Sequence, residues 1–337
     1  MFIRVHLWLK NIRDLKMNKE ISRRDFITKL AGATALAGCS IGAGLFFHNR
    51  RLVPESASLK SVQNFAVAGT ENLMTVVNGN DSALLVKAAL QKLGGINKFI
   101  KPGDRVLIKP NCAFDRPPHL GATTSPEVVA EIVRQCVSAG AEVRVSDNPI
   151  NNAEGCFVKS GLKNAAEKNG AEIWLPHPSL FKRTRVGKMK IKEWDVMYEP
   201  LAWATKLIGV PTVKSHNLSG ASLTMKNWYG FLGHGRNRLH QSINEVIADL
   251  GTFITPTLVI LDGTRILKTN GPTGGSMADV EPGNVIVAGT DQVAIDAYGV
   301  KLLKQDISEI KYLSLAEQLG IGTTDYKSLK GFSEISL

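Results

Sequence analysis

Short apolar runs alternate with longer amphipathic stretches along the chain from residue 61 onward. These runs predict strands at 105–108, 142–145, 171–175, 207–213, 258–261 and 285–288. Most of them are apolar at consecutive positions, which is typical of strands buried on both faces. The stretch opened by Thr124-Ser-Pro-Glu127 repeats apolar residues at helical spacing and predicts a helix that starts with a capping box. This order of strands and helices predicts an α/β fold with a largely parallel sheet and helices on both faces. The sheet would form one body or two α/β lobes around a cleft.

Other segments carry simpler patterns. Residues 81–93 and 158–169 each predict one helix, and residues 222–230 also predict helical structure. The basic stretch 182–192 predicts a hairpin or an exposed loop. Together these elements place one α/β domain at residues 61–337.

The first 60 residues differ from the rest in net charge and in the arrangement of their apolar residues. They hold 11 Lys or Arg and 4 Asp or Glu, so they carry +7 of the formal +11. Arg23 and Arg24 precede Phe26 and an apolar stretch that reaches Phe47, an arrangement that resembles a twin-arginine export signal. We therefore expect a signal or membrane anchor at residues 1–48, a polar linker at 49–60, and a partner in the twin-arginine export machinery. A start at Met17 would give a leader of more usual length.

Three fates of this leader are open. The sequence Leu36-Ala-Gly-Cys39 resembles a lipobox, in which Cys39 would be lipidated. The apolar run continues past Cys39, and at 18 residues it is near the minimum for a membrane-spanning helix, so an uncleaved anchor is the second possibility. The third is a cleaved, soluble product. We expect export to a periplasmic or other extracytoplasmic location, with attachment to the membrane through the N-terminus.

The remaining composition excludes some classes of protein. Residues 61–337 hold 30 basic and 26 acidic side chains and no basic stripe with interleaved aromatics, so nucleic acid is not an expected partner. No two of the four cysteines form a C-x-x-C pair, which argues against an iron–sulfur cluster. A disulfide between Cys112 and Cys156 stays open at this point.

Compact polar groups follow four of the apolar runs: Lys109-Pro-Asn111, Ser146-Asp-Asn-Pro149, Lys214-Ser-His216 and Asp262-Gly263. In a parallel sheet these groups would lie along one edge, and open α/β sheets bind ligands outside the carboxyl ends of their strands. Asp, Asn, Gly and Pro are ordinary residues at strand ends. A lysine on an apolar strand, by contrast, requires a partner or a ligand.

These groups lead to specific assignments. We predict Asp147, His216 and Lys214 as catalytic residues, with substrate contacts from Lys109, Asn111, Ser222, Lys226 and Asn227. The lysines would neutralise an anion, and a lysine among other cations tends toward a lowered pKa that suits proton abstraction. His216, Asp147 and Asp262 could bind a divalent metal. The cofactor is otherwise undetermined.

The same stretches resemble the domain of unknown function 362 family, through Val106-Leu-Ile-Lys-Pro-Asn111, Ser146-Asp-Asn-Pro149, Lys214-Ser-His216, Met225-Lys-Asn227 and Asp262-Gly263. The resemblance covers roughly residues 65–305. Some members of that family carry an added ferredoxin-like module, whose cysteines this chain lacks. The family is also distantly similar in architecture to nickel-dependent lactate racemase, which implies two α/β lobes around a cleft.

Three functions follow from the sequence. The leading one is an exported, membrane-tethered enzyme that acts on a small anionic substrate by isomerisation or metal-assisted hydrolysis. The second is a non-catalytic lipoprotein that binds a solute or a metal. The third is a redox subunit whose cofactor is inserted before export.

Overall fold

The computed structural model describes residues 59–337. The predicted twin-arginine signal, the predicted lipobox with Cys39 and almost all of the predicted linker lie outside the described residues. In the described part, no helix is both long and apolar enough to cross a membrane.

Ten strands form one sheet, and eight of them follow the order β12-β1-β11-β10-β7-β2-β3-β4. β8 pairs with β10, and β9 pairs with β8. β5 and β6 form a separate antiparallel hairpin. The bounds are β1 Leu73–Asn78, β2 Arg105–Pro110, β3 Glu142–Val145, β4 Glu172–Ile173, β5 Phe181–Arg185, β6 Glu193–Met197, β7 Lys206–Val210, β8 Thr212–His216, β9 Gly220–Ser222, β10 Leu258–Leu267, β11 Val280–Gly289 and β12 Gly331–Ser336.

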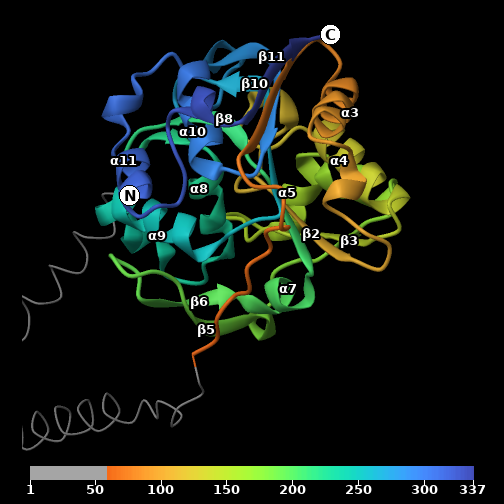
Figure 1. Ribbon diagram of the computed structural model, residues 1–337. Helices are drawn as coiled ribbons and strands as arrows, with labels where there is room; N and C mark the ends of the chain where they lie inside the picture. Colours follow the sequence, from red (N-terminus) through yellow and green to blue (C-terminus); the bar gives the residue numbers. More distant parts are fainter. Residues whose placement is uncertain (1–58) are drawn as a thin grey trace, which may run out of the picture. The chain divides into compact units, whose positions relative to one another are not determined.

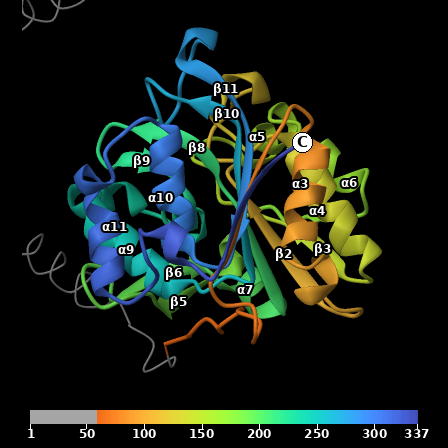
Figure 2. The same cartoon turned by 45° about the horizontal axis from the view of Figure 1, so that its top comes forward.

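Helices cover both faces of the sheet. In Figure 2, α9, α10 and α11 lie on one side of the strands, and α3, α4 and α6 lie on the other. The bounds are α3 Ser82–Lys92, α4 Pro126–Ser138, α5 Ala153–Lys159, α6 Leu162–Glu167, α7 Tyr198–Trp203, α8 Thr224–Asn227, α9 Ile243–Phe253, α10 Gln292–Leu302 and α11 Lys311–Gln318. Figure 1 gives the order of these elements along the chain.

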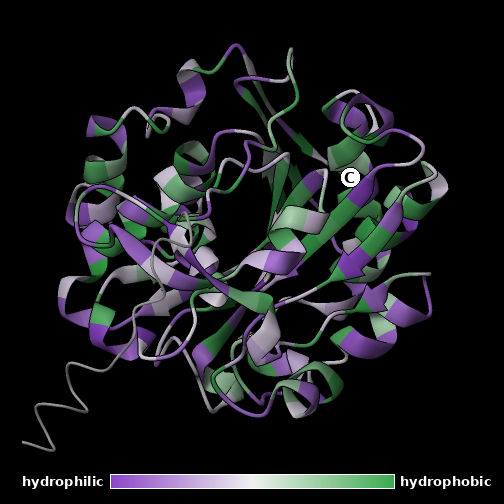
Figure 3. Ribbon diagram, turned by 90° about the horizontal axis from the view of Figure 1, so that it is seen from below, coloured by the Kyte–Doolittle hydropathy of each residue, from purple (hydrophilic) through white to green (hydrophobic). Residues whose placement is uncertain are grey.

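The alternation of side chains along each strand explains the two layers. In β2, Leu107 packs into one apolar core, whereas Val106 and Ile108 pack into the core on the opposite face. Figure 3 shows hydrophobic residues along the central strands. Burial on both faces is what a continuous apolar run predicts, so the expected α/β fold with a mostly parallel sheet is confirmed. Residues 59–337 form one compact unit rather than two separate lobes.

Three local predictions need correction. The run 207–213 is two strands, β7 and β8, because Pro211 stands between them and cannot donate a backbone hydrogen bond. Residues 158–169 contain parts of two helices, α5 and α6, separated at Gly161, which has a φ of +76°. The N-cap of α4 is Ser125, and its side chain makes no capping hydrogen bond. Its hydroxyl instead contacts Thr264 and Arg265.

Candidate functional site

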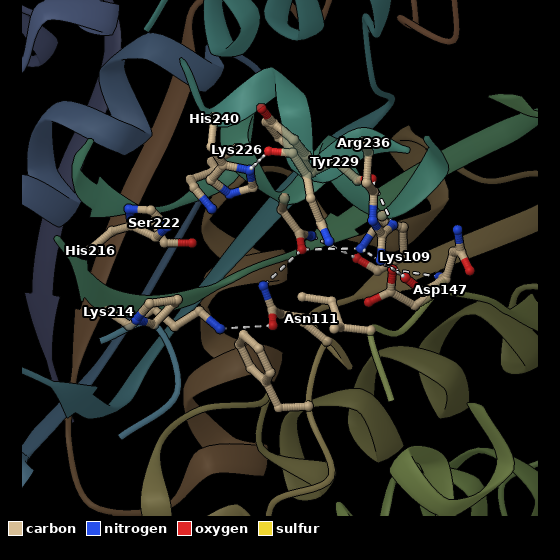
Figure 4. Close-up of a pocket in the computed structure, with 18 residues that line it drawn as sticks. Lys109, Asn111, Asp147, Lys214, His216, Ser222, Lys226, Tyr229, Arg236 and His240 are labelled. Carbon is tan, nitrogen blue, oxygen red and sulfur yellow. Dashed lines mark hydrogen bonds and ion pairs between the residues drawn. The ribbon is translucent and has the colours of Figure 1, made fainter. Parts of the chain in front are cut away.

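A cavity of about 80 Å³ lies at the carboxyl ends of β2, β3 and β8 (Figure 4). All eight residues predicted to be catalytic or to contact substrate line this one cavity, namely Lys109, Asn111, Asp147, Lys214, His216, Ser222, Lys226 and Asn227. The strand order explains the convergence, because β2 lies between β7 and β3 and its end therefore adjoins the residues that follow β3. Asp262 does not line the cavity.

Lys109 and Asp147 form a buried ion pair. Lys109 Nζ lies 2.7 Å from Asp147 Oδ1, and the two side chains are 1% and 2% exposed. Burial lowers the pKa of Lys109, and the neighbouring Asp147 carboxylate raises it again. The carboxylate also accepts hydrogen bonds from the backbone N–H groups of Asn148 and Cys112. With three donors on one carboxylate, Asp147 joins its own segment to β2 and the residues that follow it, and has little capacity left for a metal or a substrate proton.

Two amides connect this pair to a second lysine. Lys109 Nζ donates to Asn227 Oδ1 over 3.1 Å, and Asn111 Nδ2 donates to the same oxygen over 3.2 Å. Lys214 Nζ then donates to Asn111 Oδ1 over 3.0 Å and to the carbonyl of Ala122 over 2.8 Å. These hydrogen bonds form a continuous network from the Lys109 amine through the amides of Asn227 and Asn111 to the Lys214 amine. The network fixes which way each amide faces, because each oxygen accepts from a lysine.

His216 is held as a neutral hydrogen-bond donor. Its Nδ1 accepts from the backbone N–H groups of Leu218 and Ser219, at 3.2 and 3.3 Å, so the hydrogen of the neutral ring is on Nε2. Burial and the charge of Lys226 lower the pKa of His216 to about 2. The imidazole is therefore suited to donate a hydrogen bond from Nε2, and it is poorly suited to accept a proton.

The charge of the cavity is strongly unbalanced. Within the described residues, its lining includes four cationic side chains (Lys109, Lys214, Lys226 and Arg236) and one carboxylate, and only Lys109 forms an ion pair. Burial, helped by Lys226, lowers the pKa of Lys214 well below its ordinary value. Burial and the nearby Arg236 lower the pKa of Lys226 to about 7. An anion in the cavity would reverse both effects.

The cavity lining also includes residues that the sequence did not assign to it, and three of these carry polar side chains of chemical interest. Tyr229, Arg236 and His240 all face it, and the Tyr229 hydroxyl is buried without a hydrogen-bond partner. The ring of Tyr229 lies 5.4 Å from Lys226 Nζ, as in a cation–π contact. Because Tyr229 follows Lys226 by three residues in a helical segment, the two side chains share one helix face. The three-residue spacing from Lys226 could therefore have predicted from the sequence that Tyr229 lines the same cavity.

Two features position α8, the short helix that carries Lys226 and Asn227. Asp296 of α10 is fully buried, and its two carboxylate oxygens accept from the backbone N–H groups of Thr224 and Met225. Burial raises the pKa of Asp296 to about 7. Gly230 passes so close to the ion pair that a Cβ there would overlap both the Asp147 carboxylate and the Lys109 amine. Only glycine fits at this position.

The predicted metal ligands are not brought together. Asp262 accepts from the backbone N–H of Ser125 and from the N–H and hydroxyl of Thr264, away from the cavity. Across residues 59–337, no group of three or more His, Cys, Asp or Glu side chains is arranged to hold a metal ion. The expected site formed by His216, Asp147 and Asp262 is therefore wrong. Cys112 and Cys156 are free buried thiols, so the disulfide that the sequence left open is not formed.

A known protein family covers the part of the chain that forms the cavity. A family model described as a domain of unknown function (DUF362) matches residues 106–301, more than half of the chain. The chain belongs to the DUF362 family. All 18 residues that line the cavity fall inside the matched range, whereas β1, α3, α11 and β12 lie outside it. The family match and the cavity therefore coincide.

Two other proteins resemble this DUF362 chain. The thylakoid-associated protein sll1697 of Synechocystis sp. is 28% identical over 259 residues, which cover 71% of this chain and 75% of that protein. The lactate racemase apoprotein from Thermoanaerobacterium thermosaccharolyticum matches with a TM-score of 0.39 and 12% identity, over 74% of this chain and 59% of the racemase. The match thus spans less than two thirds of the racemase, and no activity is inferred from it.

Proposed function

We propose that the cavity binds a small organic anion and that the protein is an enzyme that moves a proton on it. The observation that supports this most strongly is the set of three buried or half-buried cations without a carboxylate partner: Lys214, Lys226 and Arg236. Unpaired buried charges are costly, and an anionic ligand would remove that cost. The unpartnered hydroxyl of Tyr229 supplies a further donor at the same place.

Lys226 is the best base in the cavity. With its pKa at about 7, a large fraction of its side chain is a neutral amine near neutral pH. In an isomerisation, Lys226 Nζ would take a proton from a carbon beside a carbonyl, and the electron pair would move to the carbonyl oxygen. His216 and Tyr229 would donate hydrogen bonds to that oxygen. The Lys226 ammonium would then return the proton to a neighbouring atom, so the reaction is balanced by this one proton.

Isomerisation is favoured over metal-assisted hydrolysis. The hydrolysis that the sequence suggested needed His216, Asp147 and Asp262 as ligands, and the structure does not assemble them. Asp147 is engaged by Lys109 and two backbone N–H groups. Its role in this proposal is to position Lys109 and the chain around it.

Exchange of substrate hydrogen with solvent tests this function. The full-length protein is incubated in D₂O with small carboxylates and phosphate esters that carry a C–H group beside a carbonyl, and deuterium incorporation is followed by NMR. We expect incorporation in at least one compound, with a loss of 100-fold or more in Lys226→Met, the scale of one general base. Lys87→Met, an exposed position on α3, is the matched control.

The alternative function has a different outcome in the same experiment. A non-catalytic binding protein would bind one of the anions and show no deuterium incorporation above the protein-free rate. Equal incorporation in wild type and Lys226→Met would remove the assignment of Lys226 as the base.

We propose in addition that the protein is exported and held at a membrane. The support is the Arg23-Arg24 pair with the apolar stretch behind it, and the Leu36-Ala-Gly-Cys39 sequence. Replacing both arginines by lysine should keep the protein on the cytoplasmic side of the membrane, as measured by protease accessibility in spheroplasts. Cys39→Ala should abolish incorporation of labelled fatty acid. Export that survives the double replacement would contradict the proposal.

A further inference from the structure

A second, more open groove adjoins the cationic cavity. It has a volume of about 370 Å³ and shares four lining residues with the cavity: Asn148, Ile150, Arg236 and Asn237. The cavity of about 80 Å³ accommodates a head group of a few non-hydrogen atoms and little more. Any larger anion bound there must therefore extend into the groove.

The wall between the two spaces is rigidly held. Arg236 lines both, and its guanidinium donates to the carbonyl oxygens of Tyr229, Leu232 and Asn148, at 3.1, 3.2 and 2.7 Å. Asn148 in turn donates its side-chain amide to the Leu232 carbonyl over 2.8 Å. The junction is thus preformed, and a ligand that crosses it would meet a fixed positive charge at a fixed place.

Half of the residues that line the outer groove carry a ring, and three of these rings are aromatic. The residues with rings are Pro149, Pro176, His177, Pro178, Phe181 and His234. Phe181 and His234 are stacked, with their centroids 6.4 Å apart and their planes 27° from parallel. Phe181 is anchored by packing on the main apolar core, whereas His234 is exposed. Flat, stiff side chains lose little entropy on binding and match a flat ligand surface.

We propose that this groove is a second subsite, which takes a planar aromatic group carried by the same molecule whose anionic head occupies the cavity. The substrate class is then an aromatic or heteroaromatic compound with one small acidic group. The inference rests on the proposed function of the cavity as an anion site, and it narrows the ligand that this site accepts.

Three sulfonates of equal charge test the subsite: methanesulfonate, cyclohexanesulfonate and benzenesulfonate. Each is titrated into the full-length protein and followed by NMR. We expect benzenesulfonate to bind about tenfold tighter than methanesulfonate, and tighter than cyclohexanesulfonate, from ring stacking and apolar burial. His234→Ala and Phe181→Leu should each reduce the benzenesulfonate advantage by about threefold or more, with methanesulfonate affinity unchanged within about twofold. Phe181→Leu retains an apolar side chain for the core. His119→Ala, an exposed histidine outside the groove, is the control.

The outcomes separate the two proposals. If methanesulfonate binds but benzenesulfonate gains nothing, or keeps its gain in both variants, the subsite is refuted while the anion cavity stands. If cyclohexanesulfonate gains as much as benzenesulfonate, the aromatic ligand class is refuted. If none of the sulfonates binds to wild type, the anion cavity fails first, and the subsite fails with it.

Discussion

The charge state of Lys226 makes anion binding depend on pH in a direction that the structure fixes. In the ligand-free protein, burial and the nearby Arg236 lower the pKa of Lys226 to about 7. A bound monoanion about 4 Å from the ammonium would stabilise the charged form by about 4 kcal/mol at an effective dielectric constant of about 20. When a monoanion lies directly beside Lys226, that energy keeps the amine protonated through pH 9, since about 1.4 kcal/mol corresponds to one pH unit. The proposed reaction instead requires the anionic group to lie against Lys214 and Arg236, with a C–H group facing neutral Lys226.

The consequence is a loss of affinity as the pH rises. Below pH 7 the lysine is already charged, and the full affinity is available. Above pH 7 the free protein must first take up a proton, so affinity falls by about tenfold per pH unit, or roughly 100-fold between pH 6 and pH 9. Titration of His216 does not contribute to this decline in anion affinity. Burial lowers the pKa of His216 to about 2, so that ring stays neutral over the range, and burial also lowers the pKa of His240 below its ordinary value.

Titration of methanesulfonate at pH 6, 7, 8 and 9 measures the effect, because this probe does not change its own charge. Calorimetry in two buffers of different ionisation enthalpy should also show uptake of up to one proton per anion bound at pH 8. Lys226→Met should bind more weakly at pH 6 and lose the part of the decline centred near pH 7. A wild-type affinity that stays flat from pH 6 to 9, or a Met variant with an unchanged decline, would refute the reasoning.

Three other substitutions have defined outcomes. Asp147→Asn should lower the free energy of unfolding by about 3–5 kcal/mol in denaturant titrations, because it leaves buried Lys109 without a counter-charge; adding Lys109→Met should recover part of that loss. Asp296→Ala should weaken methanesulfonate binding by about tenfold by releasing the two backbone N–H groups that fix α8, and Asp296→Asn should restore part of the affinity; equal affinities in both variants would contradict this role. Gly230→Ala should abolish binding, since its Cβ would displace the ion pair, whereas Gly275→Ala, with open space around it, should bind as wild type does.

The fold could be predicted from the sequence where consecutive apolar residues define a strand. β2 begins where the pattern placed it, because a parallel strand covered on both faces has no reason to alternate. β3 also begins where expected, although its residues alternate between buried and less buried positions. The pattern failed at Pro211, where one apolar run serves two strands. It also failed at the start of α4, since the hydroxyl of Ser125 binds Thr264 and Arg265 across the fold, and such tertiary contacts leave no local signature.

The candidate site was accessible from the sequence only in part. Ligands bind at the carboxyl ends of parallel strands, and this rule predicts from the sequence that Lys109, Asp147 and Lys214 lie together, as they do in the cavity. The same rule placed Asp262 there wrongly, because β10 runs on to Leu267 and the carboxylate bonds to its own strand and to Ser125. It could not reveal Arg236, whose guanidinium binds two carbonyl groups of the preceding turn, those of Tyr229 and Leu232, and the distant carbonyl of Asn148.

The excess of donors around the cavity has a consequence for competition with simple anions. With four cationic side chains against one paired carboxylate, and with His216 fixed as a donor, the site repels ammonium compounds and free divalent cations. Chloride, bicarbonate and inorganic phosphate meet no such barrier. A ligand of the proposed anion site must therefore outcompete simple anions through the rest of its structure, and preparations made in phosphate or high chloride would conceal its binding.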